Sequence, residues 1–168
     1  EHLLEKDVKG IWLGTFHATC ARILRYEVAH LPVKSNFVIF DADDQVSLVK
    51  KAIRELNIDE KIHRPGAIHA AISRAKNDLR LPDSYEVNSY RDEAGKRVYE
   101  RYQAMLIANN AVDFDDLLLY TAVLLEDQPA VRAQYAQRFD HILVDEFQDT
   151  NQAQYALLKS LSSIHQNL

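Results

Sequence analysis

The sequence contains little of several residue types and segments that mark large classes of proteins. Its single cysteine, Cys20, excludes an internal disulfide and a cysteine-based metal cluster. No apolar run approaches the roughly 20 residues of a membrane-spanning helix, and no signal peptide is visible. The four glycines are too scattered for a Gly-x-x-x-x-Gly-Lys-[Ser/Thr] phosphate-binding loop. These absences make a cytoplasmic protein the default expectation.

The composition that remains is typical of a globular protein. Hydrophobic residues make up 47% and charged residues 27% of the 168 residues, enough for a real core. The 20 Lys and Arg residues against 25 Asp and Glu residues give a formal net charge of −5. Because the balance is acidic, any contact with nucleic acid has to depend on local patches of the surface.

The most informative segment is an apolar run that ends in carboxylates. Residues Ile142–Val144 are typical of a strand buried on both faces of a parallel sheet, and Asp145 and Glu146 follow directly. Ligands of such sheets bind at the carboxyl ends of the strands, where two carboxylates suit Mg²⁺ and an activated water. The alternative is a strand that enters a solvated turn whose acids cap the next helix.

A second segment has the same pattern near the start of the chain. Residues 11–17 predict another buried strand, in which Thr15 and His17 share one face. Cys20, Ile23 and later apolar residues predict a helix after it, which Pro32 ends. This pattern alone favours the interpretation of His17 as a capping or hydrogen-bonded residue at a strand-to-helix junction.

The middle of the chain predicts a series of helices. After a short extended segment at 37–40, Asp41 caps one helix, Pro65 begins the next, and a longer helix starts near Tyr90. Lys76 and Asn77 are expected on the basic outer side of the second helix. By this pattern alone, such residues usually keep a helix face solvated.

Three acids open the helix that follows. Asp113 is expected to cap it, and Asp115 and Asp116 interact favourably with the helix dipole. A metal cluster with Asp145 and Glu146 is the alternative, which the spacing does not require. Further helices are expected from Pro129 and after the capping pair at 150–151.

Several segments, in the correct order, resemble motifs of one family. Residues 145–151, Asp-Glu-Phe-Gln-Asp-Thr-Asn, resemble motif II, the Walker B element, of superfamily 1 DNA helicases of the UvrD, Rep and PcrA type. Residues 14–17 resemble the helicase segment whose threonine and histidine meet the single-stranded DNA backbone. Residues 72–77 resemble part of helicase subdomain 1B, and residues 112–117 resemble the motif Val-Asp-Phe-Asp-Asp-Leu.

The resemblance implies an α/β fold class, a predominantly helical fragment with a few parallel strands of a RecA-like (P-loop NTPase) sheet. Residues 1–40 and 111–168 then belong to motor domain 1A, and residues 41–110 form the inserted helical 1B subdomain. The implied activity is ATP hydrolysis that drives 3′ to 5′ movement on single-stranded DNA and unwinding at a junction with duplex. The implied contacts to DNA are Thr15, His17, Lys76 and Asn77.

The resemblance also implies roles for the acidic segment. Asp145 binds Mg²⁺ and contributes to binding ATP. Glu146 acts as general base on the attacking water, and Gln148 senses the nucleotide. Without a phosphate loop, however, the chain alone is expected to be inactive. The alternatives are a DNA-binding or protein-interaction module without chemistry, and a stand-alone metal-dependent phosphohydrolase, for which supporting ligand spacing is lacking.

Overall fold

Most of the described chain is helical. A computed structural model describes residues 10–168, and its elements follow in chain order. The helices are α1 Phe16–Tyr26, α2 Ala42–Glu55, α3 Pro65–Asn77, α4 Tyr90–Ala108, α5 Phe114–Asp127, α6 Pro129–Arg138 and α7 Gln152–Leu161. The strands are β1 Val38–Phe40 and β2 Ala111–Asp113, and the short 3-10 turns are η1 Val28–His30, η2 Pro82–Ser84 and η3 Phe147–Asp149. The predicted fold class, mostly helical with parallel strands, is confirmed.

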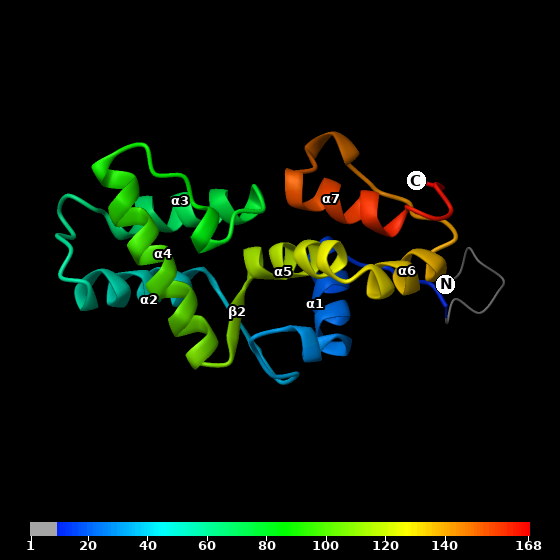
Figure 1. The fold of residues 1–168 in the computed structure, drawn as a ribbon, viewed down its shortest axis with the longest axis horizontal. Coiled ribbons are helices and arrows are strands. Elements are labelled where there is room, and N and C mark those ends of the chain that lie inside the picture. Colours follow the sequence, from blue (N-terminus) through cyan, green and yellow to red (C-terminus); the bar gives the residue numbers. More distant parts are fainter. Residues whose placement is uncertain (1–9) are drawn as a thin grey trace.

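The elements form two lobes, each with its own core (Figure 1). The middle lobe consists of α2, α3 and α4, and its core includes Ile53, Ile72, Tyr99 and Leu106. The terminal lobe consists of α1, α5, α6 and α7 and buries Leu24, Leu118, Leu125, Leu157 and other apolar side chains. Each core accounts for the helical spacing of apolar residues within its own helices.

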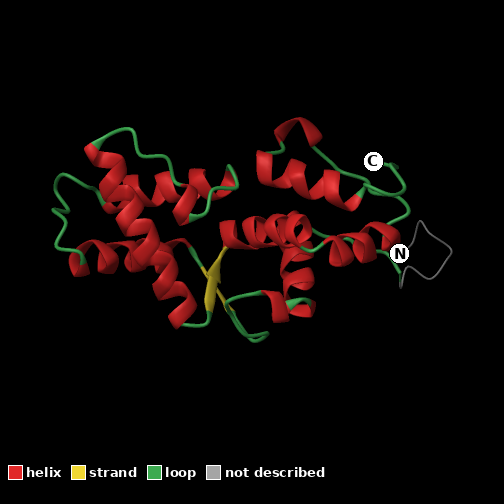
Figure 2. Ribbon diagram, viewed as in Figure 1, coloured by secondary structure: helices red, strands yellow, loops and turns green. Residues whose placement is uncertain are grey.

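The two strands join the lobes (Figure 2). β1 leads the chain into α2, and β2 carries it from α4 back to α5. The strands pair in parallel, with Ile39 opposite Val112 and Phe40 opposite Asp113. Both crossings between the lobes are therefore hydrogen-bonded to each other. The sequence predicted β1, whereas β2 was expected to belong to the following helix.

Helix starts agree with the capping residues in the sequence. The Asp41 side chain accepts hydrogen bonds from the N–H groups of Asp43 and Asp44, and Pro65 occupies the first turn of α3. Asn151 caps α7 in a capping box with Gln154.

Cys20 lies in the terminal core as expected, where burial raises the pKa of its thiol to about 12.

The prediction of strands at residues 11–17 and 142–144 is wrong. Neither segment is a strand among the described residues, and Leu143 is 96% exposed. A strand needs a partner for its backbone hydrogen bonds, and these segments have none within residues 10–168. The Ile142 N–H instead donates to the carbonyl of Asn167. Thr15 is the N-cap of α1, and His17 lies in the first turn of that helix.

None of the helices within residues 10–168 is both long enough and apolar enough to cross a membrane. The expectations that concern residues 1–9 fall outside the described part of the chain.

Candidate functional site

The acidic loop, residues 145–150, presents the carboxylates of Asp145 and Glu146 to solvent. Asp145, Glu146 and Gln148 are all exposed. The Asp145 carboxylate accepts a hydrogen bond from the Glu146 N–H at 3.0 Å, and the Gln148 amide donates to the Glu146 carboxylate. The three residues predicted for catalysis therefore lie together, with Glu146 in contact with both of the others.

The backbone of Glu146 is in the left-handed region, with φ 51° and ψ 43°. For a residue with a Cβ this conformation costs on the order of 1 kcal/mol. The turn η3 supports it, because the Asp149 N–H donates to the Glu146 carbonyl at 2.9 Å. The strained residue directs its side chain toward Gln148.

The carboxylates in the loop are a suitable donor set for Mg²⁺, which often takes one or two carboxylates and completes its shell with water and phosphate oxygens. A cage made only of protein ligands is a different case. Within residues 10–168 no group of three or more His, Cys, Asp or Glu side chains is placed to hold a metal ion. The predicted alternative of a metal cluster that joins Asp113 to the loop is therefore wrong.

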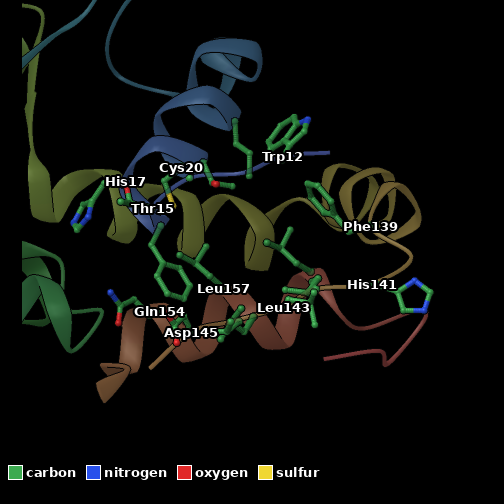
Figure 3. A pocket seen from close by; sticks show the side chains of 18 residues that line it. Trp12, Thr15, His17, Cys20, Phe139, His141, Leu143, Asp145, Gln154 and Leu157 are labelled. Carbon is green, nitrogen blue, oxygen red and sulfur yellow. The ribbon is translucent and has the colours of Figure 1, made fainter. Parts of the chain in front are cut away.

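A pocket of about 440 Å³ lies between the start of α1 and the segment that leads into the acidic loop. Thr15 and His17 line one side of it, and Asp145 lines another, next to Gln154 of α7 (Figure 3). The structure brings Thr15, His17 and Asp145 to one pocket, although the segments that carry them are not the strands that the sequence predicted.

His17 is half-buried and makes an edge-on contact with the Phe114 ring, with 5.5 Å between ring centroids. Burial lowers the pKa of His17, and the nearby charge of Asp115 opposes this only in part. The imidazole is therefore neutral at neutral pH and has one donor and one acceptor nitrogen. Thr15 is exposed, and its hydroxyl oxygen accepts a hydrogen bond from the Ala18 N–H.

The expected position of Lys76 on an outer surface is wrong. Its side chain is completely buried, and the ammonium donates to Asp113 at 2.6 Å and to Asp116 at 2.7 Å. In this position it is not available to a DNA phosphate. The sequence did contain a signal for burial, because Lys76 follows Ile72 by four residues and so lies on the same buried face of α3.

Around Lys76 lies a polar network that the sequence did not predict. The Tyr102 hydroxyl donates to Asp113 at 2.7 Å, and the Gln103 amide donates to Asp116 at 3.0 Å. The rings of Tyr99 and Tyr102 lie 5.7 and 5.1 Å from the ammonium. We call these six side chains the buried lysine cluster: Lys76, Tyr99, Tyr102, Gln103, Asp113 and Asp116.

Burial and charge act against each other in this cluster. Burial disfavours the ammonium of Lys76, but attraction to Asp116 and Asp113 outweighs it and raises the pKa of Lys76. Burial likewise opposes ionisation of Asp113, yet the Lys76 charge and its hydrogen bond lower the pKa of that carboxyl. Burial together with repulsion from Asp113 raises the pKa of Asp116 to about 6. One cation thus faces two carboxyls of unequal acidity.

Asn77 is half-buried and its amide is used within the protein. The amide N–H₂ donates to the Ser73 carbonyl at 2.8 Å and to the Asp115 carboxylate at 2.9 Å. Its oxygen accepts a hydrogen bond of 2.6 Å from the amide of Asn151. The expectation that Asn77 lies on a free outer surface is therefore wrong as well.

Comparisons with known proteins extend over the whole chain. Residues 1–168 match the family described as UvrD/REP helicase N-terminal domain. Similar proteins include ATP-dependent DNA helicase PcrA of Staphylococcus epidermidis and of Bacillus subtilis, each 41% identical over 170 residues. PcrA of Staphylococcus aureus is also 41% identical.

In each of these comparisons the alignment covers 100% of this chain and 23% of the relative, so the chain spans about a quarter of the length of the relatives that it matches. The acidic loop and the segment with Thr15 and His17 lie within the matched region. The chain belongs to the UvrD/REP helicase N-terminal domain family.

Proposed function

We propose that this chain is part of an ATP-dependent DNA helicase, in which ATP hydrolysis drives 3′ to 5′ movement along single-stranded DNA and unwinding at a duplex junction. The observation that carries the proposal is the 41% identity to PcrA helicases over the whole chain. The exposed carboxylates of the acidic loop add chemical support. A cytoplasmic location follows from the proposed work on DNA.

In this proposal Asp145 binds Mg²⁺, largely through water, and Glu146 is the general base. The metal ion, when bound, neutralises charge on the phosphate oxygens of ATP. Glu146 accepts the proton of the attacking water at its carboxylate, and Gln148 holds that carboxylate by the amide hydrogen bond already formed. Gln148 can then respond to the nucleotide because it touches the base directly.

The proposal assigns the lobes to parts of a helicase. Residues 1–40 and 111–168 form part of motor domain 1A, and residues 41–110 form the helical 1B subdomain. The two separate cores support this division, because the middle lobe buries its apolar residues within its own helices. Thr15 and His17 are proposed to contact the DNA backbone with a hydroxyl and a neutral imidazole, which are suitable donors for phosphate oxygens.

The sequence contains no phosphate-binding loop, so we expect the 168 residues alone to bind ATP weakly and to lack ATPase activity. The remaining parts of the site are expected from the rest of a longer helicase chain. In this proposal the chain supplies the general base Glu146 and the metal ligand Asp145, and another part of the helicase supplies the phosphate-binding loop.

Substitution of Glu146 by Gln in the complete helicase tests the proposal. It removes the proton acceptor and keeps the shape, so the kcat for ATP hydrolysis should fall by about a hundredfold or more while nucleotide binding persists. Glu100→Gln, at an exposed position of α4, is the matched control. Normal ATP hydrolysis by the Glu146 variant would refute the assignment.

A further inference from the structure

The side chain of Asn77 connects three elements that are far apart in the sequence. It ends α3 in the middle lobe and binds Asp115 in the first turn of α5 and Asn151 at the N-cap of α7. Within residues 10–168, its bond to Asn151 is the only hydrogen bond between the middle lobe and the segment 145–161. Asn77 is therefore the polar link between that lobe and the end of the acidic loop.

The position requires a side chain that both donates and accepts. Asp115 offers only an acceptor at 2.9 Å, and Asn151 offers a donor at 2.6 Å. Asn151 is itself held, because its oxygen accepts from the Gln154 N–H and its own N–H donates to the Gln154 side chain. A change in the loop that displaces the α7 cap must therefore move or break the bond to Asn77.

The neighbouring Lys76 attaches the end of α3 to the start of α5. Its two short bonds to Asp113 and Asp116 attach α3 to the start of α5 inside the protein. Because Lys76 cannot leave its partners without uncovering a buried ammonium, the end of α3 stays attached to α5, and a displacement at Asn77 can only reorient the middle lobe about that attachment. The adjacent residues thus form a buried attachment to α5 and a half-buried contact to α7.

We propose that Asn77 is a positioning residue that couples the acidic loop to the middle lobe, so that the state of the ATP site sets the placement of this lobe on DNA. The inference rests on the proposed helicase function. Asn77 does not touch the reacting atoms in this scheme. It acts through Asn151, which follows the loop by one residue.

The test uses an exchange of two side chains of nearly equal size in the complete helicase. Asn77→Asp places two carboxylates against each other at 2.9 Å and removes the donor to Asp115. The double variant N77D/D115N keeps the acceptor for Asn151 at residue 77 and restores the bond between residues 77 and 115, now with the donor at residue 115. Asn88→Asp, at an exposed position of the same lobe, is the matched control.

The measurements are the kcat for ATP hydrolysis with and without single-stranded DNA, together with the Tm. We expect N77D to lower the DNA-stimulated kcat by about tenfold, the effect of one lost charge-assisted bond, and to leave the basal kcat unchanged. N77D/D115N should recover most of the stimulation. N88D and D115N alone should behave like the unmodified helicase, since an amide at residue 115 still offers an oxygen to Asn77.

Three results separate the possible failures. An unmodified helicase without DNA-stimulated ATPase activity would overturn the proposed function, and with it the basis of this inference. A stimulated kcat in N77D equal to that of the unmodified helicase would overturn the inference alone. A parallel loss of basal and stimulated rates together with a lower Tm, unrepaired by the double variant, would also overturn it, because Asn77 would then serve folding only.

Discussion

Replacement of Lys76 by Met is expected to destabilise the protein by an amount that depends on pH. Lys76 and Asp116 are completely buried, and the Asp113 side chain is 3% exposed, so solvent cannot substitute for the lost ammonium. Removal of one partner from such a pair typically costs about 3–5 kcal/mol. We therefore expect the free energy of unfolding at about pH 7.5 to fall by about 3–5 kcal/mol in K76M.

The sign of the pH dependence follows from the carboxyls that remain. Without Lys76, burial still acts to raise the pKa of Asp113 and of Asp116, repulsion from Asp113 still acts on Asp116, and the opposing attraction to the ammonium is gone. A carboxyl with a raised pKa stabilises the folded state below its unfolded pKa of 3.8, and this contribution is lost as pH rises through the folded pKa. The deficit of K76M should therefore grow between about pH 4.5 and pH 7.5.

Urea unfolding followed by circular dichroism at both pH values measures this difference. The deficit should be larger at the higher pH by at least ~1.4 kcal/mol, the energy of one pKa unit. Lys51→Met, at an exposed position of α2, is the control and should change little at either pH. An unchanged stability of K76M, or an equal deficit at both pH values, would show that the ion pairs of Lys76 with Asp113 and Asp116 do not stabilise the folded protein.

Two further changes test the surroundings of this cluster by their effect on unfolding. Tyr102→Phe removes the hydroxyl donor to Asp113 and should lower the free energy of unfolding, measured in urea, by about 1.5–3 kcal/mol. The control Tyr90→Phe, at a residue that is 80% exposed, should not change the free energy of unfolding measurably. Equal stability of the two variants would contradict this prediction. Asn151→Ala removes the α7 cap and the bond to Asn77 and should cost about 1–2 kcal/mol in thermal unfolding, and an unchanged Tm would show that the cap is dispensable.

Local rules in the sequence were sufficient to predict most helices. Asp41 and Asn151 cap helices because their side chains bond N–H groups two or three residues away, which the sequence alone records. Pro65 and Pro129 begin helices because a missing N–H costs nothing in the first turn. These interactions lie within one turn, so no knowledge of the tertiary structure is required.

The burial of Lys76 could not be predicted from such local rules. A lysine on a helix is usually exposed, and its partners here lie 37 and 40 residues further along the chain. The acids at 113 and 116 were correctly predicted as a helix start, and Asp113 and Asp116 do form a capping box. That they also neutralise a buried lysine depends on how α3 packs against α5, which periodicity does not specify.

The apolar run at 142–144 shows a different limit. Its residues indicate burial, but a strand is defined by hydrogen bonds to a neighbouring strand. Within residues 10–168 the run has no such neighbour, and Leu143 is exposed. Thr15, His17 and Asp145 nevertheless come together in the structure, because both segments line one pocket.

The junction between the lobes contains polar bonds where an apolar contact would be simpler. Apolar surfaces are non-directional and permit one helix to slide on another, whereas the bonds of Lys76 to Asp113 and Asp116 hold the end of α3 at one point of α5. Asn77 lies at the edge of the same helix face and is only half-buried, so water can reach its bonds more easily than those of Lys76. Lys76 therefore keeps the end of α3 attached to α5, and the adjacent Asn77 can release and regain Asn151 while that attachment persists.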